Sequence, residues 1–439
     1  MYRKAIEELK YWKEKADRKP IIIKGARQTG KTWLMKEFGH TCYEQYAYIN
    51  FDNNPRMKTL FHSDFDTDRI ILGLQVEAGC TIIPGETLIL LDEVQEVPYA
   101  LASLKYFYEN APEHHIVAAG SMLGVSIHPG VSFPVGKVEF LNLFPLSFPE
   151  YLLATGNKSL HDIIEALDFK MLSVFSTKLT ELLKQYYVVG GMPEVVKNFI
   201  QNSDFAEVQH IQKQLLAAYE KDFSKHAPGR IVHRIRAVWN SLPAQLAREN
   251  RKFVFGLLKK GARAREYELA IQWLFDCGLI NKVDRITKPG IPISAYRDNA
   301  AFKLYVLDVG LLCAMSHLDP KSILQGNILF EEFKGALTEQ FVLQQLISSA
   351  GINPFYWSAS RSSGEVDFVV QTNGMALPLE VKAAENLQAK SLKSYYLRYS
   401  PSKAFRTSLS GYREEEWLIN IPLYAIHSFT KIVCAISES

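Results

Sequence analysis

Short apolar runs alternate with amphipathic stretches through the first third of the chain. Continuous apolar or β-branched runs predict strands at residues 20–24, 46–52, 87–91 and 115–120. Between and after these runs, apolar residues recur with helical spacing at residues 31–38, 53–62, 67–78 and 98–110. Strands that alternate with helices in this way predict a doubly wound parallel sheet. We therefore expect an α/β domain over residues 1–150.

Helical periodicity dominates the next part of the chain, and we expect a helical lid over residues 151–227. Gly190-Gly191 interrupts this pattern, either as a hinge or as a plain connector between helices. From 228 to 325 the order is three helices and then two strands, at 279–283 and 303–307. This order resembles a winged-helix domain, in which Glu266–Cys277 would be the recognition helix.

The last segment, residues 326–439, again mixes strands with helices. Apolar spacing predicts an amphipathic helix from Phe333 to Ile347, and two strands follow at 363–370 and 377–382. We expect a separate C-terminal α/β domain here.

The segment after the first predicted strand matches a phosphate-binding loop. The pattern G-x-x-x-x-G-K-[ST] is completed by Gly25, Ala26, Arg27, Gln28, Thr29, Gly30, Lys31 and Thr32. The glycines let successive N–H groups turn inward around phosphates, and the N-terminus of the next helix adds partial positive charge. Lys31 would reach the β- and γ-phosphates of ATP, and the Thr32 hydroxyl would be a ligand of Mg²⁺. The alternative is a glycine turn with a solvated lysine.

Two later strand ends supply the remaining residues of such a site. The apolar run from Thr87 ends in Asp92 and Glu93, at the carboxyl end of a predicted parallel strand, where ligands of α/β sheets bind. Asp92 would hold Mg²⁺ and Glu93 would polarise the attacking water, unless both are solvated acids at a strand end. Ser121 follows the strand at 115–120 and could sense the γ-phosphate, although a turn or helix-capping serine fits equally well.

Taken together, these motifs resemble those of prokaryotic AAA-type ATPases that carry a C-terminal domain of unknown function, DUF4143. The resemblance rests on the P-loop, Leu-Leu-Asp-Glu-Val-Gln at 90–95, Ala-Gly-Ser at 119–121, Asn-Leu-Phe-Pro-Leu-Ser-Phe-Pro-Glu at 142–150 and Gly-Gly-Met-Pro-Glu at 190–194. It implies Mg²⁺-dependent ATP hydrolysis. The chain departs from the family pattern at Lys137, where we expect an arginine. A lysine keeps the charge of an arginine finger but lacks its bidentate fork.

The two C-terminal strands carry acids and a lysine at nuclease-like spacing. Asp367 lies in the first strand, and Glu380 and Lys382 share one face of the second. Asp367 and Glu380 could bind a second divalent cation, with Lys382 placed to activate water or to stabilise developing charge. Glu339, on the preceding helix, could add a third carboxylate. The segment resembles the PD-(D/E)xK fold of restriction endonucleases; the alternative is a retired nuclease fold whose carboxylates form surface ion pairs.

Composition limits the partners that this chain can have. The 439 residues exceed what one hydrophobic core usually holds, so several domains are expected. The 50 basic and 47 acidic residues give a net charge of +3, so any attraction to nucleic acid must be local. Basic residues crowd before the helix at 266–277, and the candidate contacts are Arg251, Lys252, Lys259, Lys260, Arg263 and Arg265. They could bind DNA phosphates, or they form a solvated face or a protein-binding face.

Cysteine usage and hydropathy bear on the compartment. The five cysteines are far apart in sequence and indicate neither a zinc site nor a disulfide framework, which suits a reducing compartment. The N-terminal segment is charged and lacks the apolar core of a signal peptide. No apolar run approaches the roughly 20 residues that cross a bilayer. We expect a cytoplasmic protein without membrane contact.

Two functional hypotheses follow from these patterns. In the first, Mg²⁺-dependent ATP hydrolysis rearranges a nuclease-like effector domain that acts on DNA. In the second, an ATP-gated switch or scaffold uses the two later domains to contact other protein subunits and cleaves nothing. Both require the same parts: an ATPase core (1–150), a helical lid (151–227), a winged-helix-like domain (228–325) and a nuclease-like domain (326–439).

Overall fold

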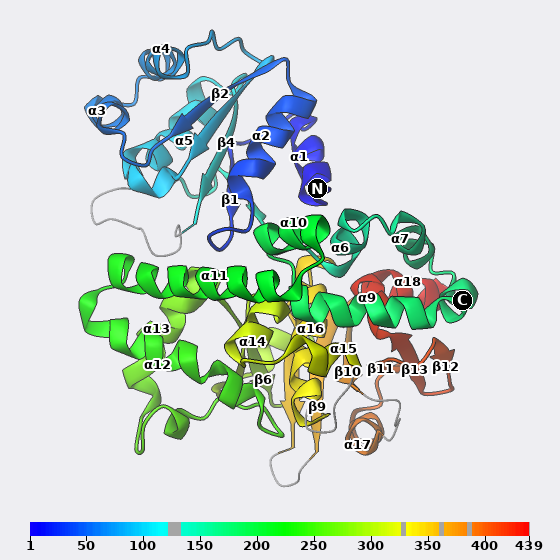
Figure 1. The fold of residues 1–439 in the computed structure, drawn as a ribbon. Coiled ribbons are helices and arrows are strands. Elements are labelled where there is room, and N and C mark those ends of the chain that lie inside the picture. Colours follow the sequence, from blue (N-terminus) through cyan, green and yellow to red (C-terminus); the bar gives the residue numbers. More distant parts are fainter. Residues whose placement is uncertain (122–132, 326–330, 360–363, 384–388, 439) are drawn as a thin grey trace. The chain divides into compact units, whose positions relative to one another are not determined.

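The chain folds into two compact units (Figure 1). The structure is a computed structural model that describes residues 1–121, 133–325, 331–359, 364–383 and 389–438. The N-terminal unit comprises Tyr2–Phe144 with Asp276–Gly278, and the C-terminal unit comprises Pro145–Phe275 with Leu279–Ser439. The first division lies close to the expected boundary at residue 150. The expected boundaries at 227 and 325 do not separate compact units.

A five-stranded parallel sheet forms the centre of the N-terminal unit. Its strand order is β2-β3-β4-β1-β5, and the strands are β1 (Ile21–Lys24), β2 (Gln45–Asn50), β3 (Thr87–Asp92), β4 (His115–Gly120) and β5 (Glu139–Asn142). Every residue of β3 and β4 is buried, which explains the apolar runs at 88–91 and 116–119. The predicted parallel sheet is confirmed.

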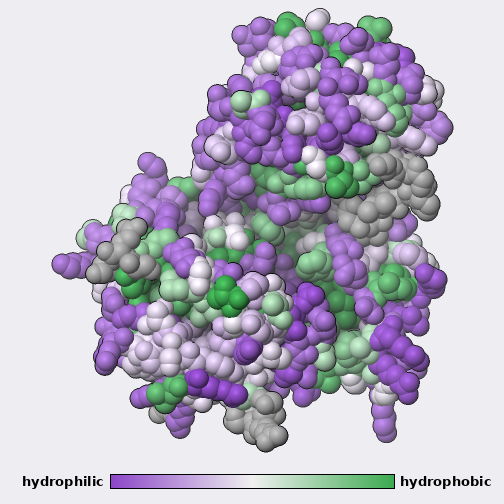
Figure 2. All heavy atoms as spheres, turned by 180° about the vertical axis from the view of Figure 1, so that it is seen from behind, coloured by the Kyte–Doolittle hydropathy of each residue, from purple (hydrophilic) through white to green (hydrophobic). Residues whose placement is uncertain are grey.

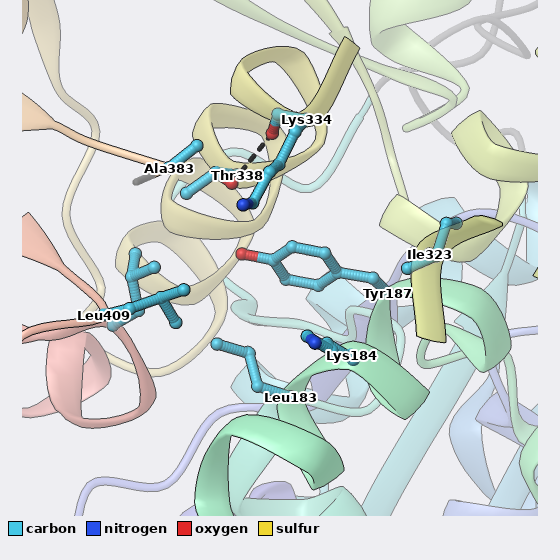
Figure 3. A pocket seen from close by; sticks show the side chains of 9 residues that line it. Leu183, Lys184, Tyr187, Ile323, Lys334, Thr338, Ala383 and Leu409 are labelled. Atoms are coloured by element: carbon cyan, nitrogen blue, oxygen red, sulfur yellow. Dashed lines mark hydrogen bonds between the residues drawn. The ribbon is translucent and has the colours of Figure 1, made fainter. Parts of the chain in front are cut away.

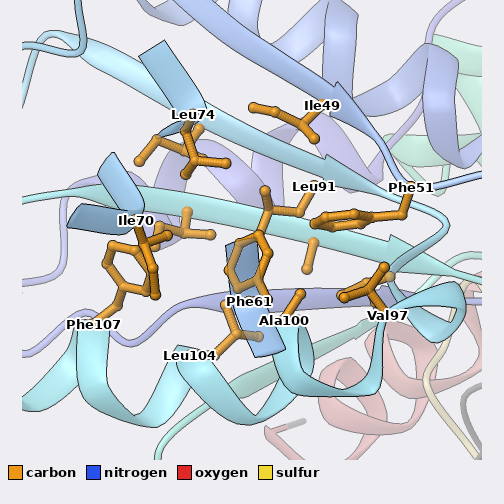
Figure 4. Packing of buried hydrophobic residues seen from close by; sticks show 14 of the residues in the cluster. Ile49, Phe51, Phe61, Ile70, Leu74, Leu91, Val97, Ala100, Leu104 and Phe107 are labelled. Atoms are coloured by element: carbon orange, nitrogen blue, oxygen red, sulfur yellow. The ribbon is translucent and has the colours of Figure 1, made fainter. Parts of the chain in front are cut away.

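Helices cover both faces of this sheet. They are α1 (Ala5–Lys13), α2 (Lys31–Cys42), α3 (Pro55–Ser63), α4 (Thr67–Ala78), the 3₁₀ turn η1 (Val94–Glu96) and α5 (Pro98–Asn110). Side chains alternate along β3, so Leu91 packs with Phe61, Leu74 and Leu104 from α3, α4 and α5 (Figure 4). Leu90 points to the other face and packs in the cluster formed with α1 and α2.

An eight-stranded mixed sheet organises the C-terminal unit. Its order is β12-β13-β11-β10-β9-β8-β6-β7, and the strands are β6 (Ile280–Ile286), β7 (Arg297–Val306), β8 (Phe355–Ser358), β9 (Glu365–Thr372), β10 (Met375–Val381), β11 (Ala404–Ser408), β12 (Arg413–Glu414) and β13 (Leu418–Pro422). β6 and β7 form an antiparallel hairpin, and β6 also pairs in parallel with β8, with Ile286 opposite Trp357. The two strands expected in a winged helix therefore extend the sheet of the expected nuclease-like domain. This shared sheet is why no division falls at residue 325.

Helices surround this second sheet. They are α6 (Phe148–Ala154), α7 (Lys158–Glu165), α8 (Phe169–Val174), α9 (Ser176–Val189), α10 (Pro193–Asn202), α11 (Phe205–His226), α12 (Gly229–Leu246), η2 (Phe255–Leu257), α13 (Ala264–Asp276), η3 (Ile293–Tyr296), α14 (Val309–Met315), α15 (Pro320–Gln325), α16 (Glu331–Ser348), α17 (Lys390–Tyr399), η5 (Leu423–Ser428) and α18 (Phe429–Glu438). α16 buries polar side chains that bind other segments. Gln340 exchanges hydrogen bonds with the backbone of Val306, and Gln345 Oε1 accepts from Phe148 N–H at 2.9 Å. α16 thereby fastens the lid segment to the sheet.

The Gly190-Gly191 pair is a packed connector. A Cβ at Gly190 would lie 2.1 Å from Asp308 Oδ2, and one at Gly191 would lie 2.1 Å from the Leu146 carbonyl oxygen. Gly190 also has a φ of 71°, which favours glycine. The close packing favours a connector over a hinge.

One face of the protein is mostly polar. Hydrophilic residues cover much of the face in Figure 2, and hydrophobic ones occur in small groups. Within the described residues, no helix combines the length and the apolar character needed to span a membrane.

Candidate functional site

The P-loop connects β1 to α2 in the N-terminal unit. Gly30 caps the helix with a φ of 92°, and Gln28 also has a positive φ of 65°, so the loop uses left-handed backbone. A Cβ at Gly25 would lie 2.3 Å from the carbonyl oxygen of Leu143, which is too close for any other residue without displacing the chain. The loop thus has the strand–loop–helix geometry that the motif requires.

Lys31 is folded back against its own loop. Its Nζ donates to the carbonyl oxygens of Gly25 at 3.0 Å and Ala26 at 2.8 Å. Burial lowers the pKa of Lys31 to about 8, against the opposing effect of Glu93 and Asp92. A buried ammonium that donates to neutral carbonyls is well suited to exchange those bonds for bonds to phosphate oxygens.

Asp92 gathers three donors at the carboxyl end of β3. Its Oδ2 accepts from Thr32 Oγ1 at 2.6 Å and from Tyr48 OH at 2.9 Å, and its Oδ1 accepts from the N–H of Glu93 at 3.0 Å. The P-loop threonine and the strand-end aspartate, 60 positions apart in sequence, are therefore in direct contact. The contact of Tyr48 with Asp92 could not be predicted from the sequence, because the alternation of apolar and polar residues on a strand does not show which polar side chain faces a site.

Glu93 adopts an uncommon backbone conformation. Its φ of 54° and ψ of 42° are left-handed, a region that non-glycine residues rarely occupy away from functional or turn positions. The amide of Gln95 donates to Glu93 Oε2, and Gln95 itself is buried. The carboxylate of Glu93 is thus oriented by a residue two positions later in the chain.

Ser121 follows β4, which lies between β1 and β3 in the sheet. Parallel strands end at one edge, so Ser121 lies at the same edge as the P-loop and Asp92. It is buried, and its Oγ accepts a long hydrogen bond, 3.4 Å, from Arg27 Nε of the P-loop. The structure places Ser121 beside the loop.

Arg3 supports the P-loop from the N-terminal segment. Its guanidinium is buried and donates to the Thr29 carbonyl oxygen at 3.1 Å and to the Phe144 carbonyl oxygen at 2.5 Å. It therefore fixes the middle of the loop to the segment after β5. The burial of Arg3 could not be predicted from the sequence, because charged residues in an N-terminal segment are usually exposed.

Lys137 lies away from the P-loop edge. Its Nζ pairs with Glu109 at 2.9 Å, and it precedes β5, whose first residue Glu139 is opposite Ile21 at the amino end of β1. The P-loop follows the carboxyl end of β1. Lys137 is therefore at the opposite edge of its own sheet.

Two carboxylates and a lysine come together on β9 and β10 of the C-terminal unit. Leu379 pairs with Phe368, so the next position in the antiparallel register sets Glu380 beside Asp367. Asp367 Oδ2 accepts from the N–H of Val381 at 2.8 Å, and Lys382 Nζ pairs with Glu380 Oε1 at 2.8 Å. The register thus places Asp367 opposite Glu380, and Lys382 pairs with Glu380.

The environment of these acids is poorly solvated. Burial, and next the charge of Glu339, raises the pKa of Asp367 to about 7. Glu380 is 5% exposed, and its Oε2 is buried without a hydrogen-bond partner among the described residues. A buried, unbonded carboxylate oxygen is costly, and a cation is the partner that would satisfy it.

Glu339 occupies α16 and is fully engaged by the protein. Arg251 and Tyr305 donate to its two oxygens, and Lys303 Nζ donates at 3.1 Å. Burial alone would raise the pKa of Glu339, but Arg251 and Lys303 hold it below its usual value. Among the described residues, no group of three or more His, Cys, Asp or Glu side chains could hold a metal ion.

Known protein families match the N-terminal and the C-terminal segments of this chain. Residues 17–152 match an AAA domain, and residues 334–426 match the domain of unknown function DUF4143. The AAA match thus covers the P-loop sheet, and the DUF4143 match covers most of α16 and strands β8 to β13. Residues 180–322 match a further domain of unknown function, DUF8612. This match spans the expected boundary between lid and winged helix.

Relatives and solved structures are distant. Uncharacterized proteins of Mycobacterium bovis and Mycobacterium tuberculosis are each 23% identical over 367 residues, which is 82% of this chain and 70% of theirs. A Walker-type ATPase of Pyrococcus abyssi is 15% identical, with a TM-score of 0.44, and the match covers 70% of this chain and 94% of that one. The Aeropyrum pernix ORC1 protein in complex with DNA is 13% identical, with a TM-score of 0.25 over 72% and 91% of the two chains.

The basic segment between α12 and α13 divides into exposed and internal residues. Its exposed cations include Lys252, Lys259, Lys260 and Arg263, and Arg265 in the first turn of α13 is also exposed. Arg251 differs, because its side chain is 16% exposed and pairs with Glu339. Arg251 is thus part of the charged site next to the DUF4143 carboxylates, and the others lie at the surface.

A small pocket lies beside the end of β10. It is lined by Tyr187 from α9, Thr338 from α16 and Ala383, which follows Lys382 (Figure 3). The Tyr187 hydroxyl points toward Thr338, whose Oγ1 donates to the carbonyl of Lys334 at 2.8 Å. A volume of about 30 Å³ admits about one water molecule and no nucleotide.

Proposed function

We propose that this protein hydrolyses ATP at the P-loop of its AAA domain and uses the cycle to act on nucleic acid through its DUF4143 domain. The observation that carries the first part is the 2.6 Å contact between Thr32 Oγ1 and Asp92 Oδ2. An oxygen from the first turn of α2 and one from the end of β3 meet beside a loop whose N–H groups and lysine suit phosphates.

The AAA-domain residues have distinct proposed roles. Gly25 to Thr32 would cradle the phosphates, and Lys31 would move from its carbonyl partners to the β- and γ-phosphate oxygens. Glu93 would accept a proton from the attacking water, oriented by its bond from Gln95. Ser121 would hydrogen-bond the γ-phosphate from the end of β4.

The oxygens around Asp92 fit Mg²⁺, which prefers hard oxygen ligands and keeps several waters. Thr32 and Asp92 would hold it, and Tyr48 would keep the Asp92 carboxylate in place. When bound, Mg²⁺ supplies charge that stabilises the phosphoryl group in transfer.

The DUF4143 domain would provide the effector site. Asp367 and Glu380 would hold a divalent cation, because the Glu380 Oε2 is buried without a partner among the residues that the structure describes. Lys382 lies at 2.8 Å from Glu380 and would orient water or a phosphate oxygen. Such a cation, when bound, activates water for attack on a phosphodiester.

The proposed substrate is nucleic acid, DNA first among the candidates. The exposed cations between α12 and α13 offer non-specific phosphate contacts. Neutralising Lys259 and Lys260 together should weaken binding and flatten its dependence on salt. Binding that keeps the wild-type salt slope would remove this surface from the proposal.

A second function is favoured by one observation. Glu339 is neutralised by Arg251 and Lys303, so only two carboxylates remain in the nuclease-like site. An ATP-gated switch or scaffold that contacts other protein subunits would need no cleavage chemistry there. DNA binding or partner binding without strand cleavage would support this second function.

Two experiments separate these possibilities. ATP binding and phosphate release are measured for the wild type and Lys31→Ala; binding and turnover should both be lost in the variant, and unchanged turnover would refute the P-loop assignment. Plasmid and oligonucleotide cleavage with Mg²⁺ or Mn²⁺ is compared among the wild type, Asp367→Ala and Lys382→Ala. Cleavage that survives both substitutions would show that these residues do not form a nuclease site.

A further inference from the structure

The third expected carboxylate of the nuclease-like site has permanent cationic partners. Arg251 donates to one oxygen of Glu339, and Lys303 and Tyr305 donate to the other. Glu339 is 1% exposed. Both oxygens are therefore satisfied by donors that the chain itself provides.

Space for the Arg251 guanidinium is built into α16. A Cβ at Gly335, one turn before Glu339, would lie 2.8 Å from Arg251 Nη2. The segment that carries Arg251 is fastened to β7, since the N–H of Phe253 donates to the carbonyl of Phe302 at 2.9 Å. Arg251 itself has a φ of 47°, an uncommon left-handed conformation. These features fix Arg251 against the helix.

Positive and negative charges are equal in number in the ion pairs around Glu339, and acids are in excess at the neighbouring Asp367 and Glu380. We call the following four residues the ion cluster: Arg251, Lys303, Glu339 and Glu365. Its two cations match its two acids, with Lys303 Nζ 2.7 Å from Glu365. Asp367 adds a further acid that interacts with the same two cations, Arg251 and Lys303, so the acids outnumber the cations there. Lys382 is the cation that pairs with Glu380. When Asp367 and Glu380 are both ionised, a net negative charge remains at that pair.

We infer that Arg251 stands in for a metal ion at Glu339, so that the C-terminal site takes one divalent cation, on Asp367 and Glu380, and none on Glu339. The inference rests on the proposed cation site. The site would then combine one exchangeable cation with one fixed guanidinium. A guanidinium has five N–H donors, and the buried Nε of Arg251 has no acceptor within the described part of the chain.

The test is the number of Mn²⁺ ions bound per full-length chain, measured by titration with electron paramagnetic resonance. All proteins carry Asp92→Asn, so that the AAA domain contributes no bound ion. The parent should bind one Mn²⁺, and adding Asp367→Asn should abolish this binding. Adding Arg251→Met leaves one oxygen of Glu339 without its donor, while Lys303 and Tyr305 keep the other. A second Mn²⁺ should then bind at the freed oxygen, or the first should bind roughly tenfold more tightly because a nearby positive charge is gone.

Matched variants control for charge and for folding. Arg251→Lys keeps the positive charge and should keep one Mn²⁺. Arg248→Met, at an exposed arginine three positions earlier, should leave Mn²⁺ binding unchanged. Arg251→Gln serves as a second neutral variant should the methionine variant unfold. Folding of each variant is checked by hydrogen exchange of β9 and β10.

Three results would overturn the inference. Two Mn²⁺ ions in the parent would show that Glu339 or another group already binds metal. One Mn²⁺ of unchanged affinity in folded Arg251→Met and Arg251→Gln would reject the role of Arg251 and leave the proposed cation site standing. No Mn²⁺ in any protein would reject the inference and the proposed cation site together.

Discussion

Lys303→Met should destabilise the C-terminal unit strongly, because Lys303 is the hub of the ion cluster. Its Nζ is fully buried and donates to Glu339 at 3.1 Å and to Glu365 at 2.7 Å. Burial opposes the ammonium, but Glu339 and Glu365 outweigh that effect and raise the pKa of Lys303. Methionine keeps most of the volume and removes the charge, which leaves Glu365 without this partner.

The expected cost follows from the environment. Breaking a buried ion pair by removing one partner costs about 3–5 kcal/mol. The Glu365 side chain is 20% exposed and can recruit water, so we expect about 3 kcal/mol, at the low end of that range. Adding Glu365→Gln removes one stranded carboxylate and should restore part of the loss.

The free energy of unfolding is measured in urea, with hydrogen exchange of peptides from β7 and β9 as the signal. These peptides report on the C-terminal unit and not on the N-terminal unit. Lys282→Met is the matched control on the neighbouring strand, because Lys282 pairs with Asp284 at 2.8 Å but is 31% exposed. The control should cost less than about 1 kcal/mol. A Lys303→Met cost equal to that of the control would refute the description of a buried, mutually dependent ion cluster.

Three further predictions concern the AAA domain. Gly25→Ala should weaken ATP binding by more than roughly tenfold, seen by calorimetry, because its Cβ would lie 2.3 Å from the Leu143 carbonyl oxygen; Gly229→Ala, whose Cβ meets nothing within 4 Å, is the control. Arg3→Met should lower the stability of the N-terminal unit by about 2–4 kcal/mol in thermal unfolding, since two charge-assisted hydrogen bonds are lost; unchanged stability would contradict this support of the P-loop. Ser121→Ala should slow turnover at saturating ATP by roughly tenfold and leave ATP affinity within threefold; weaker affinity with unchanged turnover would assign Ser121 to binding alone.

Local sequence predicted the AAA domain well. Its strands were expected at 20–24, 46–52, 87–91 and 115–120, and the structure has β1 to β4 within two residues of these limits. Buried parallel strands are continuously apolar, so the pattern leaves few alternatives. The contact between Thr32 and Asp92 also follows, because both residues end up at the same edge of one parallel sheet.

Contacts across the C-terminal unit could not be predicted in the same way. Alternation indicates that residues 279–283 and 303–307 form strands, but it does not say which strand lies beside them, so the hairpin was assigned to a separate winged helix. Arg251 was grouped with exposed cations because sequence spacing cannot tell a surface arginine from one that reaches a carboxylate 88 positions later. Arg251 pairs with Glu339 because a buried acid without a partner would be costly. That cost cannot be read from the sequence, because Glu339 becomes buried only when α16 packs against β7.

The central claim, ATP hydrolysis at the AAA domain, is tested most directly by phosphate release from radiolabelled ATP by the wild type and Glu93→Gln. The wild type should release phosphate only with Mg²⁺. Glu93→Gln should still bind ATP and release phosphate roughly 10² to 10⁴ times more slowly, as expected when a general base is lost. No release by the wild type, or release by Glu93→Gln at the wild-type rate, would contradict the claim.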